Sequence, residues 1–145
     1  MRKKLKQKTV VITLFLAFLF LSYQSIFADQ TKKEAALTAA ENWLALVDGE
    51  KYAASWQDAA AYFKRAVSED QWTQSMTAFR RTLGKVLSRT LASQNYTKAL
   101  PGAPDGEYMV IQYRTSFERK AASIETVTPM LDTDGVWRVS GYYIK

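Results

Sequence analysis

The chain has 145 residues, with 20 Lys or Arg against 14 Asp or Glu, and it has neither cysteine nor histidine. Without cysteine, disulfides, thiol nucleophiles and thiolate metal sites are excluded, and without histidine the commonest general base and metal ligand is missing. The net charge of +6 would suit nucleic acid only if the surplus lay on the folded domain.

Residues 1–28 have the pattern of a secretory signal peptide. Five basic residues precede an apolar run over residues 9–21, and a more polar stretch ends at Ala28. The run is short for a bilayer span of about 20 residues, so we expect cleavage between Ala28 and Asp29. An uncleaved anchor is the alternative if residues 22–28 are counted with the run. Residues 29–145 then carry 15 basic and 14 acidic residues, so the surplus belongs to the leader and nucleic acid is not expected as a partner.

Export to the periplasm or the extracellular space follows from this leader, and residues 29–145 are expected to form a single domain. Thr31 and Glu34 have the spacing of a capping box, which predicts the start of a helix. The helix is expected to end at Asp48, with Gly49 supplying a left-handed turn.

Two further helical segments are expected. One covers about residues 50–66 and has a possible break near Asp58. Another begins at a second capping box, formed by Ser68 and Gln71, and ends at Gly84.

The pattern after Gly84 predicts strands, at residues 86–100, 107–117, 121–131 and 136–144. The second strand alternates, which places Met109, Ile111, Tyr113, Thr115 and Phe117 on one face. Pro129 cannot donate to a ladder and indicates an edge or a bulge. Helices followed by strands predict an α+β domain, with N-terminal helices packed on a curved four-stranded antiparallel sheet. Such a sheet would leave a conical cavity suited to an apolar ligand.

Residues 113–117, 125–129 and 134–143 resemble the domain-of-unknown-function 4019 family (DUF4019), which comprises small exported bacterial proteins. The segment Trp137–Tyr142 is the most specific part, and the helical half with its tryptophans is also similar. The resemblance covers about residues 33–144. It implies a nuclear transport factor 2-like or cystatin-like fold and export. It implies no activity, because a fold alone cannot supply one.

Glu125 is the candidate catalytic residue, because it lies in an otherwise uncharged strand. If it faced an apolar cavity, burial would destabilise its charged form. The carboxylate would then accept a proton more readily and could act as a general base. Tyr113 or Tyr142 could then donate to an oxyanion. The alternative is a Glu125 that faces solvent or pairs with Arg114 or Arg138. We expect Glu125→Gln to abolish a proton-shifting activity and to leave a binding function untouched.

Two groups of side chains are candidates for ligand contacts. Aromatic residues could line a pocket for an apolar or sugar-like ligand, although their spacing also suits a core: Trp43, Trp56, Tyr113, Trp137 and Tyr142. A basic run could meet an acidic ligand or lipid headgroups, although a solvated helix end is the alternative: Arg80, Arg81, Lys85 and Arg89.

The segment Asp132–Gly135 resembles the opening of a calcium loop, but Val136 and Trp137 occupy positions where oxygen ligands should follow. A hairpin turn is the better interpretation, and neither a metal nor a cofactor is expected.

The favoured function is a non-enzymatic domain that binds a small apolar ligand or a protein partner. One alternative is a proton-shifting isomerase or lyase that uses a cavity carboxylate. Another is a structural homodimer that pairs through the outer sheet face, where Tyr108, Val110 and Gln112 give a mixed character. Membrane contact is expected only through an uncleaved leader.

Overall fold

A computed structural model describes residues 29–145 of the chain, which divides into two units, residues 1–34 and 35–145. The predicted signal peptide lies outside the described residues. In the first unit, residues 29–34 are helical, so the prediction that a capping box at Thr31 starts the helix is wrong. Ion pairing of Lys33 with Asp29 at 2.7 Å, four residues apart, supports this helical turn instead.

Four helical segments precede the sheet in the second unit. Residues 35–48 are helical, and α2 (Tyr52–Gln57), α3 (Ala61–Ala66) and α4 (Glu69–Leu83) follow. The predicted break near Asp58 is confirmed, because Asp58 follows the last residue of α2. The capping box of Ser68 and Gln71 and the end of α4 at Gly84 are also confirmed. None of the described helices is long and apolar enough to cross a membrane.

The turn after residue 48 differs from the prediction. Glu50, not Gly49, takes the left-handed conformation, with a φ of 59°. The helix ends at Asp48 as expected, and the backbone N–H of Lys51 donates to the carbonyl of Leu46 at 2.8 Å, so the left-handed residue lies one position later than predicted.

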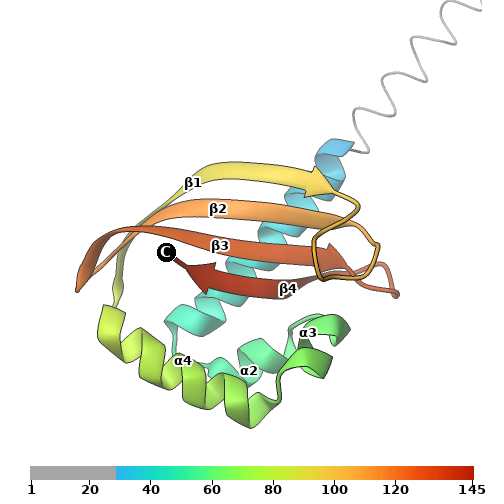
Figure 1. Ribbon diagram of the computed structural model, residues 1–145. Helices are drawn as coiled ribbons and strands as arrows, with labels where there is room; N and C mark the ends of the chain where they lie inside the picture. The colour runs from blue at the N-terminus through green and yellow to red at the C-terminus, as the bar shows by residue number, and fades with distance from the viewer. Residues whose placement is uncertain (1–28) are drawn as a thin grey trace, which may run out of the picture. The chain divides into compact units, whose positions relative to one another are not determined.

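The sheet is an antiparallel meander in the order β1-β2-β3-β4 (Figure 1). Its strands are β1 (Val86–Thr97), β2 (Tyr108–Phe117), β3 (Lys120–Leu131) and β4 (Trp137–Ile144). The predicted α+β class is therefore confirmed. The register shifts between Thr128 and Pro129, so the bulge expected at Pro129 is present in an internal strand.

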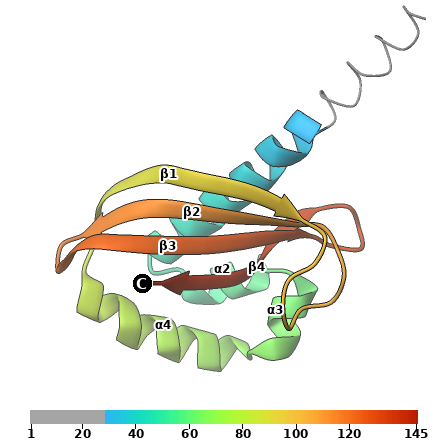
Figure 2. The ribbon, with the colours of Figure 1, turned by 45° about the horizontal axis from the view of Figure 1, so that its top comes forward.

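One face of the sheet, here called the inner face, packs on residues 35–48 and α4. Figure 2 shows these helical residues crossing behind the strands, with α4 on the β4 side. The five β2 residues predicted to share a face are all buried. The indole of Trp43 is 1% exposed and lies 5.7 Å from that of Trp72 and 5.2 Å from the ring of Tyr142, between centroids. These aromatic side chains fill the centre of the space between the helices and the sheet.

The opposite face, here called the outer face, is covered at one end by residues 98–107. Tyr108 was expected on a partly exposed face but is fully buried, with Ala60 and Met130 beside it. Its hydroxyl donates to the carbonyl of Pro104 at 2.6 Å, so the loop forms a lid over this end. Residues 98–107 do not cover the rest of the outer face.

Candidate functional site

Charged side chains from four parts of the second unit meet beneath the sheet. Residue 48 ends the first helix, residue 80 lies in α4, residue 89 in β1 and residue 125 in β3. Two hydroxyl groups from β2 and β4 complete the group. We call it the charged cluster: Asp48, Arg80, Arg89, Thr115, Glu125 and Tyr142.

Glu125 is fully buried, and both of its carboxylate oxygens are occupied. Its Oε2 accepts from Arg89 Nε at 2.6 Å and from Thr115 Oγ1 at 2.9 Å. Its Oε1 accepts from Tyr142 Oη at 2.6 Å and from Arg89 Nη2 at 3.2 Å. Each carboxylate oxygen of Glu125 thus accepts two hydrogen bonds from side chains of the domain.

Asp48 joins the two arginines of the cluster. Its Oδ2 accepts from Arg89 Nη1 at 2.6 Å, and its Oδ1 accepts from Arg80 Nη2 at 2.9 Å. Arg80 is 6% exposed and also lies over the ring of Phe117, 4.9 Å from its centroid. Two cations thus face two anions, which is the arrangement that allows charges to be buried.

The sequence predicted the wrong partners for Glu125. Arg114 lies on the outer face, because successive side chains of a strand alternate and Arg114 precedes the buried Thr115. Arg138 instead makes two hydrogen bonds to Asp134, both 2.8 Å long. A solvated helix end was also wrong for Arg80 and Arg89, since both arginines are paired in the charged cluster.

The cluster shifts two ionisation equilibria. Burial raises the pKa of Tyr142, and the adjacent Glu125 carboxylate raises it further. Burial alone would lower the pKa of Arg89, but its hydrogen bonds to Asp48 and Glu125 outweigh burial and raise that pKa. Both shifts favour the protonated forms of Tyr142 and Arg89, which are the forms that donate the hydrogen bonds of the cluster.

Tyr113, opposite Glu125 in the β2–β3 ladder, gives a testable contrast with Tyr142. Its buried hydroxyl has no hydrogen-bond partner within the described part of the chain. We expect Tyr113→Phe to be neutral or to raise the free energy of unfolding by up to about 1 kcal/mol, and Tyr142→Phe to lower it by about 1.5–3 kcal/mol. Urea denaturation at pH 7 measures both, and equal losses would contradict the distinction.

Ionisation of Tyr113 is expected to lower the stability of the protein at alkaline pH. Burial raises the pKa of Tyr113 to about 12, above the ordinary value of 10.0. Because the folded pKa is the higher one, its contribution is complete below pH 10 and is lost as the pH rises toward 12. The decline measured over that range should be smaller for Tyr113→Phe than for the unsubstituted protein.

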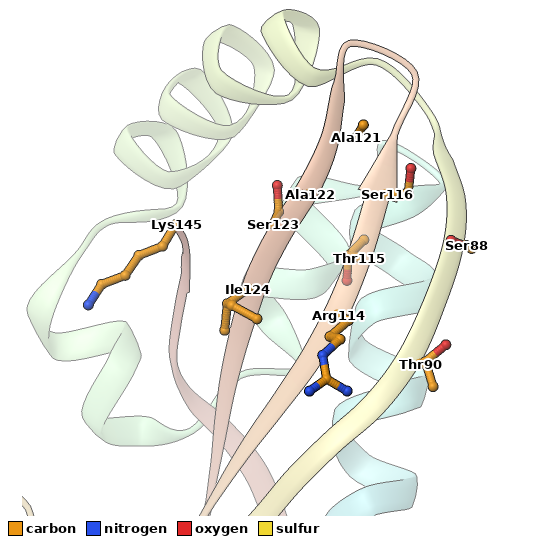
Figure 3. A pocket seen from close by; sticks show the side chains of 10 residues that line it. All are labelled: Ser88, Thr90, Arg114, Thr115, Ser116, Ala121, Ala122, Ser123, Ile124 and Lys145. Atoms are coloured by element: carbon orange, nitrogen blue, oxygen red, sulfur yellow. The ribbon is translucent and has the colours of Figure 1, made fainter.

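A groove of about 660 Å³ opens on the uncovered part of the outer face (Figure 3). Most of its lining side chains are short, which leaves the space above the sheet empty. The lining residues are Ser88, Thr90, Arg114, Thr115, Ser116, Ala121, Ala122, Ser123, Ile124 and Lys145. We call this site the outer groove.

The strand register sets the outer groove in two rows across the sheet. The first row runs Thr90, Arg114, Ile124 and Lys145, because Thr90 pairs with Arg114, Arg114 with Ile124, and the backbone of Ile124 bonds to Lys145. In the next row Ser88 pairs with Ser116. Neighbouring strands lie about 4.8 Å apart, so the four members of the first row span three such spacings.

The outer groove carries positive charge. Arg114 and Lys145 are its charged residues, and no acid is among the described residues that line it. Within residues 29–145, the exposed Arg114 guanidinium has no hydrogen bond or ion pair. The ammonium of Lys145 lies 5.7 Å from the ring centroid of Tyr143. The groove therefore offers an unpaired cation above an uncharged floor.

Comparison with known proteins adds a family. The family model for DUF4019, described as a protein of unknown function, matches residues 39–142. The chain belongs to the DUF4019 family. No curated protein matches the chain. The matched residues of this DUF4019 protein contain every member of the charged cluster and all of the outer groove except Lys145.

The aromatic ligand candidates take different positions in this DUF4019 domain. Trp43 lies in the core, where its Nε1 donates to the carbonyl of Ser55 at 2.7 Å. The half-buried Trp56 donates to the carbonyl of Val67 at 2.8 Å. Tyr113 and Tyr142 lie on the inner face, at or beside the charged cluster. Their role in ligand binding stays a prediction.

Trp137 is 8% exposed and lines a second groove of about 500 Å³. That groove lies between the helical residues 35–42 and the start of β4. Trp137 is therefore the aromatic candidate that the structure places beside an open space.

The turn expected at Asp132–Gly135 is confirmed. The N–H of Gly135 donates to the carbonyl of Asp132 at 2.9 Å, and Gly135 has a φ of 79°. Arg138, followed by the Val136 N–H, lowers the pKa of Asp134 to about 2. Asp132 Oδ2 accepts from the N–H of Ala61 at 3.0 Å. No group of three or more acids arranged to hold a metal occurs among residues 29–145.

The outer groove of the DUF4019 domain was not among the sites predicted from the sequence. Arg114 was considered only as a partner of Glu125. The alternation of β2 already placed it on the face opposite Tyr113 and Thr115, which was a usable signal. The small residues Ser88 and Ala122 carried no signal of their own, since the groove exists only where the strands bring them together.

Proposed function

We propose that this protein is an exported, non-enzymatic binding domain and that it holds its ligand in the outer groove. The groove carries the proposal, because its volume of about 660 Å³ lies within the usual range of about 300–1,000 Å³ for small-molecule sites. On the inner face Trp43 and Trp72 fill the centre, and the groove beside Trp137, at about 500 Å³, is the smaller of the two spaces. The leader supports export to the periplasm or the extracellular space.

A nuclear transport factor 2-like or cystatin-like relationship is part of the proposal. The order of helices before a four-stranded meander supports it. In that architecture a ligand is expected between helix and sheet, whereas the aromatic core of this chain favours the opposite face.

The proton-shifting alternative has less support. A general base needs a free oxygen within hydrogen-bond reach of its substrate. Both oxygens of Glu125 already accept two hydrogen bonds each, from Arg89, Thr115 and Tyr142. The carboxylate is therefore better suited to joining elements of the fold than to chemistry.

A substitution that fills the outer groove tests the proposal. Ala122 is exposed and lines the groove, so Ala122→Trp should occupy its space without disturbing the core. Ligand-observed NMR with a fragment library should give hits for the unsubstituted protein, and at least tenfold weaker binding of those hits to Ala122→Trp.

The control is Ala78→Trp, which places the same side chain on the exposed surface of α4. It should keep the hits of the unsubstituted protein. Hits that survive in Ala122→Trp, or a library that yields none, would contradict the proposed site. Native mass spectrometry of the same samples would reveal a dimer, the mark of the homodimer alternative.

A further inference from the structure

We infer that the ligand of the outer groove is an amphipathic organic carboxylate, whose acid group binds Arg114 and whose apolar part lies over Ile124 and Ala122. The inference rests on the proposed function and specifies the ligand class of that site.

The guanidinium of Arg114 is unpaired within residues 29–145. The buried Arg80 and the partly exposed Arg89 and Arg138 are all ion-paired, with acids within the domain. Arg114 is different, because it stands on a central strand of the sheet with no acid among the described residues that line its groove. An anion is therefore the complement that the groove lacks.

The hydrogen-bond donors of the outer groove have a geometry that suits a carboxylate. A guanidinium is a planar fork of N–H donors that matches a carboxylate with two parallel hydrogen bonds. Thr90 lies opposite Arg114 in the β1–β2 ladder, and Ser116 lies on the same face of β2, so hydroxyl donors flank the arginine. Lys145 lies beyond Ile124 in the same row and adds positive potential (Figure 3).

Part of the floor of the outer groove is apolar. Ile124 is half-buried, and Ala121 and Ala122 are exposed, so a ligand could cover apolar surface next to the charge. No aromatic side chain is among the described lining residues, which disfavours stacking of a sugar ring. A bare inorganic ion would leave most of the groove unfilled. A carboxylic acid with a short hydrocarbon chain would match both the cationic Arg114 and the apolar floor of the groove.

The test compares octanoate with octan-1-ol, which shares its chain length and lacks the charge. Isothermal titration measures each probe against the full domain, the Arg114→Gln variant and an Arg65→Gln control. Arg65 is exposed on α3 and is not among the lining residues of the groove, so the control removes the same charge elsewhere.

We expect Arg114→Gln to weaken octanoate binding about tenfold, as for the loss of a charge-assisted hydrogen-bonded contact. Arg65→Gln should leave octanoate binding unchanged, and octan-1-ol should bind the unsubstituted protein and Arg114→Gln equally. Raising the salt concentration should weaken octanoate binding and leave octan-1-ol binding unaffected.

Equal octanoate affinity of Arg114→Gln and the unsubstituted protein would overturn the inference, and so would an equal loss in both arginine variants. Absence of octanoate binding would overturn it as well. The proposed function would survive any of these results if fragment hits were still lost in Ala122→Trp, so the two failures are distinguishable.

Discussion

Glu125→Gln is expected to lower the free energy of unfolding by about 3–5 kcal/mol. The substitution neutralises one of the two anions of the charged cluster and leaves Arg89 with only Asp48 as its counter-charge. The amide that replaces the carboxylate can accept at one atom only, so the hydrogen bonds from Thr115 and Tyr142 cannot both be kept. A buried cation left without its partner is costly, whereas an intact pair adds little to stability.

Urea denaturation at pH 7 measures this loss, and Glu41→Gln is the matched control. Glu41 is exposed on the first helix, so its substitution should change the free energy of unfolding by less than about 0.5 kcal/mol. A loss below about 1 kcal/mol for Glu125→Gln would contradict the structural role of the cluster. The result also limits the test suggested by the sequence, because inactivity of Glu125→Gln would report a damaged fold as readily as a missing base.

Trp43→Ala is expected to cost about 3–5 kcal/mol. The indole is 1% exposed, contacts the rings of Trp72 and Tyr142, and donates to the Ser55 carbonyl. Its removal would leave a large cavity and a buried carbonyl without its donor. A large loss of stability is expected for a tryptophan of the core, and a smaller one for a tryptophan that lines an empty ligand pocket.

Phe79→Ala is the control for this second substitution. Phe79 is 40% exposed on α4, so its truncation should cost less than about 1 kcal/mol. Thermal or urea unfolding compares the two variants. A Trp43→Ala protein with nearly full stability would indicate that the indole lines a space able to accept a ligand. That result would favour a ligand site on the inner face.

Local signals predicted most of the fold. Ser68 and Gln71 form the expected capping box, Gly84 ends α4 with a φ of 75°, and Pro129 lies at a bulge. Each of these features depends on residues close together in the chain. The prediction of the left-handed residue after Asp48 was wrong. Two adjacent residues, Gly49 and Glu50, could both adopt this conformation, and propensity alone favoured the glycine.

The charged cluster could not be predicted in the same way. Arg89 and Glu125 are 36 residues apart, and Asp48 and Arg89 are 41 apart, on elements that meet only in the folded domain. Glu125 could be singled out from the sequence because it is a charged residue in an otherwise uncharged strand. Identifying its arginine partners, however, required the register of β1 and the position of α4. The alternation rule could have excluded Arg114, because it places that residue on the opposite face.

We propose that the outer groove, and not the inner face, is the ligand-binding surface. Two-dimensional amide NMR during a titration with octanoate, or with the fragment hits, tests it most directly. The shifted amides should cluster at residues 88–90, 114–116, 121–124 and 145. Shifts that cluster around Trp43, Trp56 and Tyr142 would contradict it and place the ligand between the helices and the sheet.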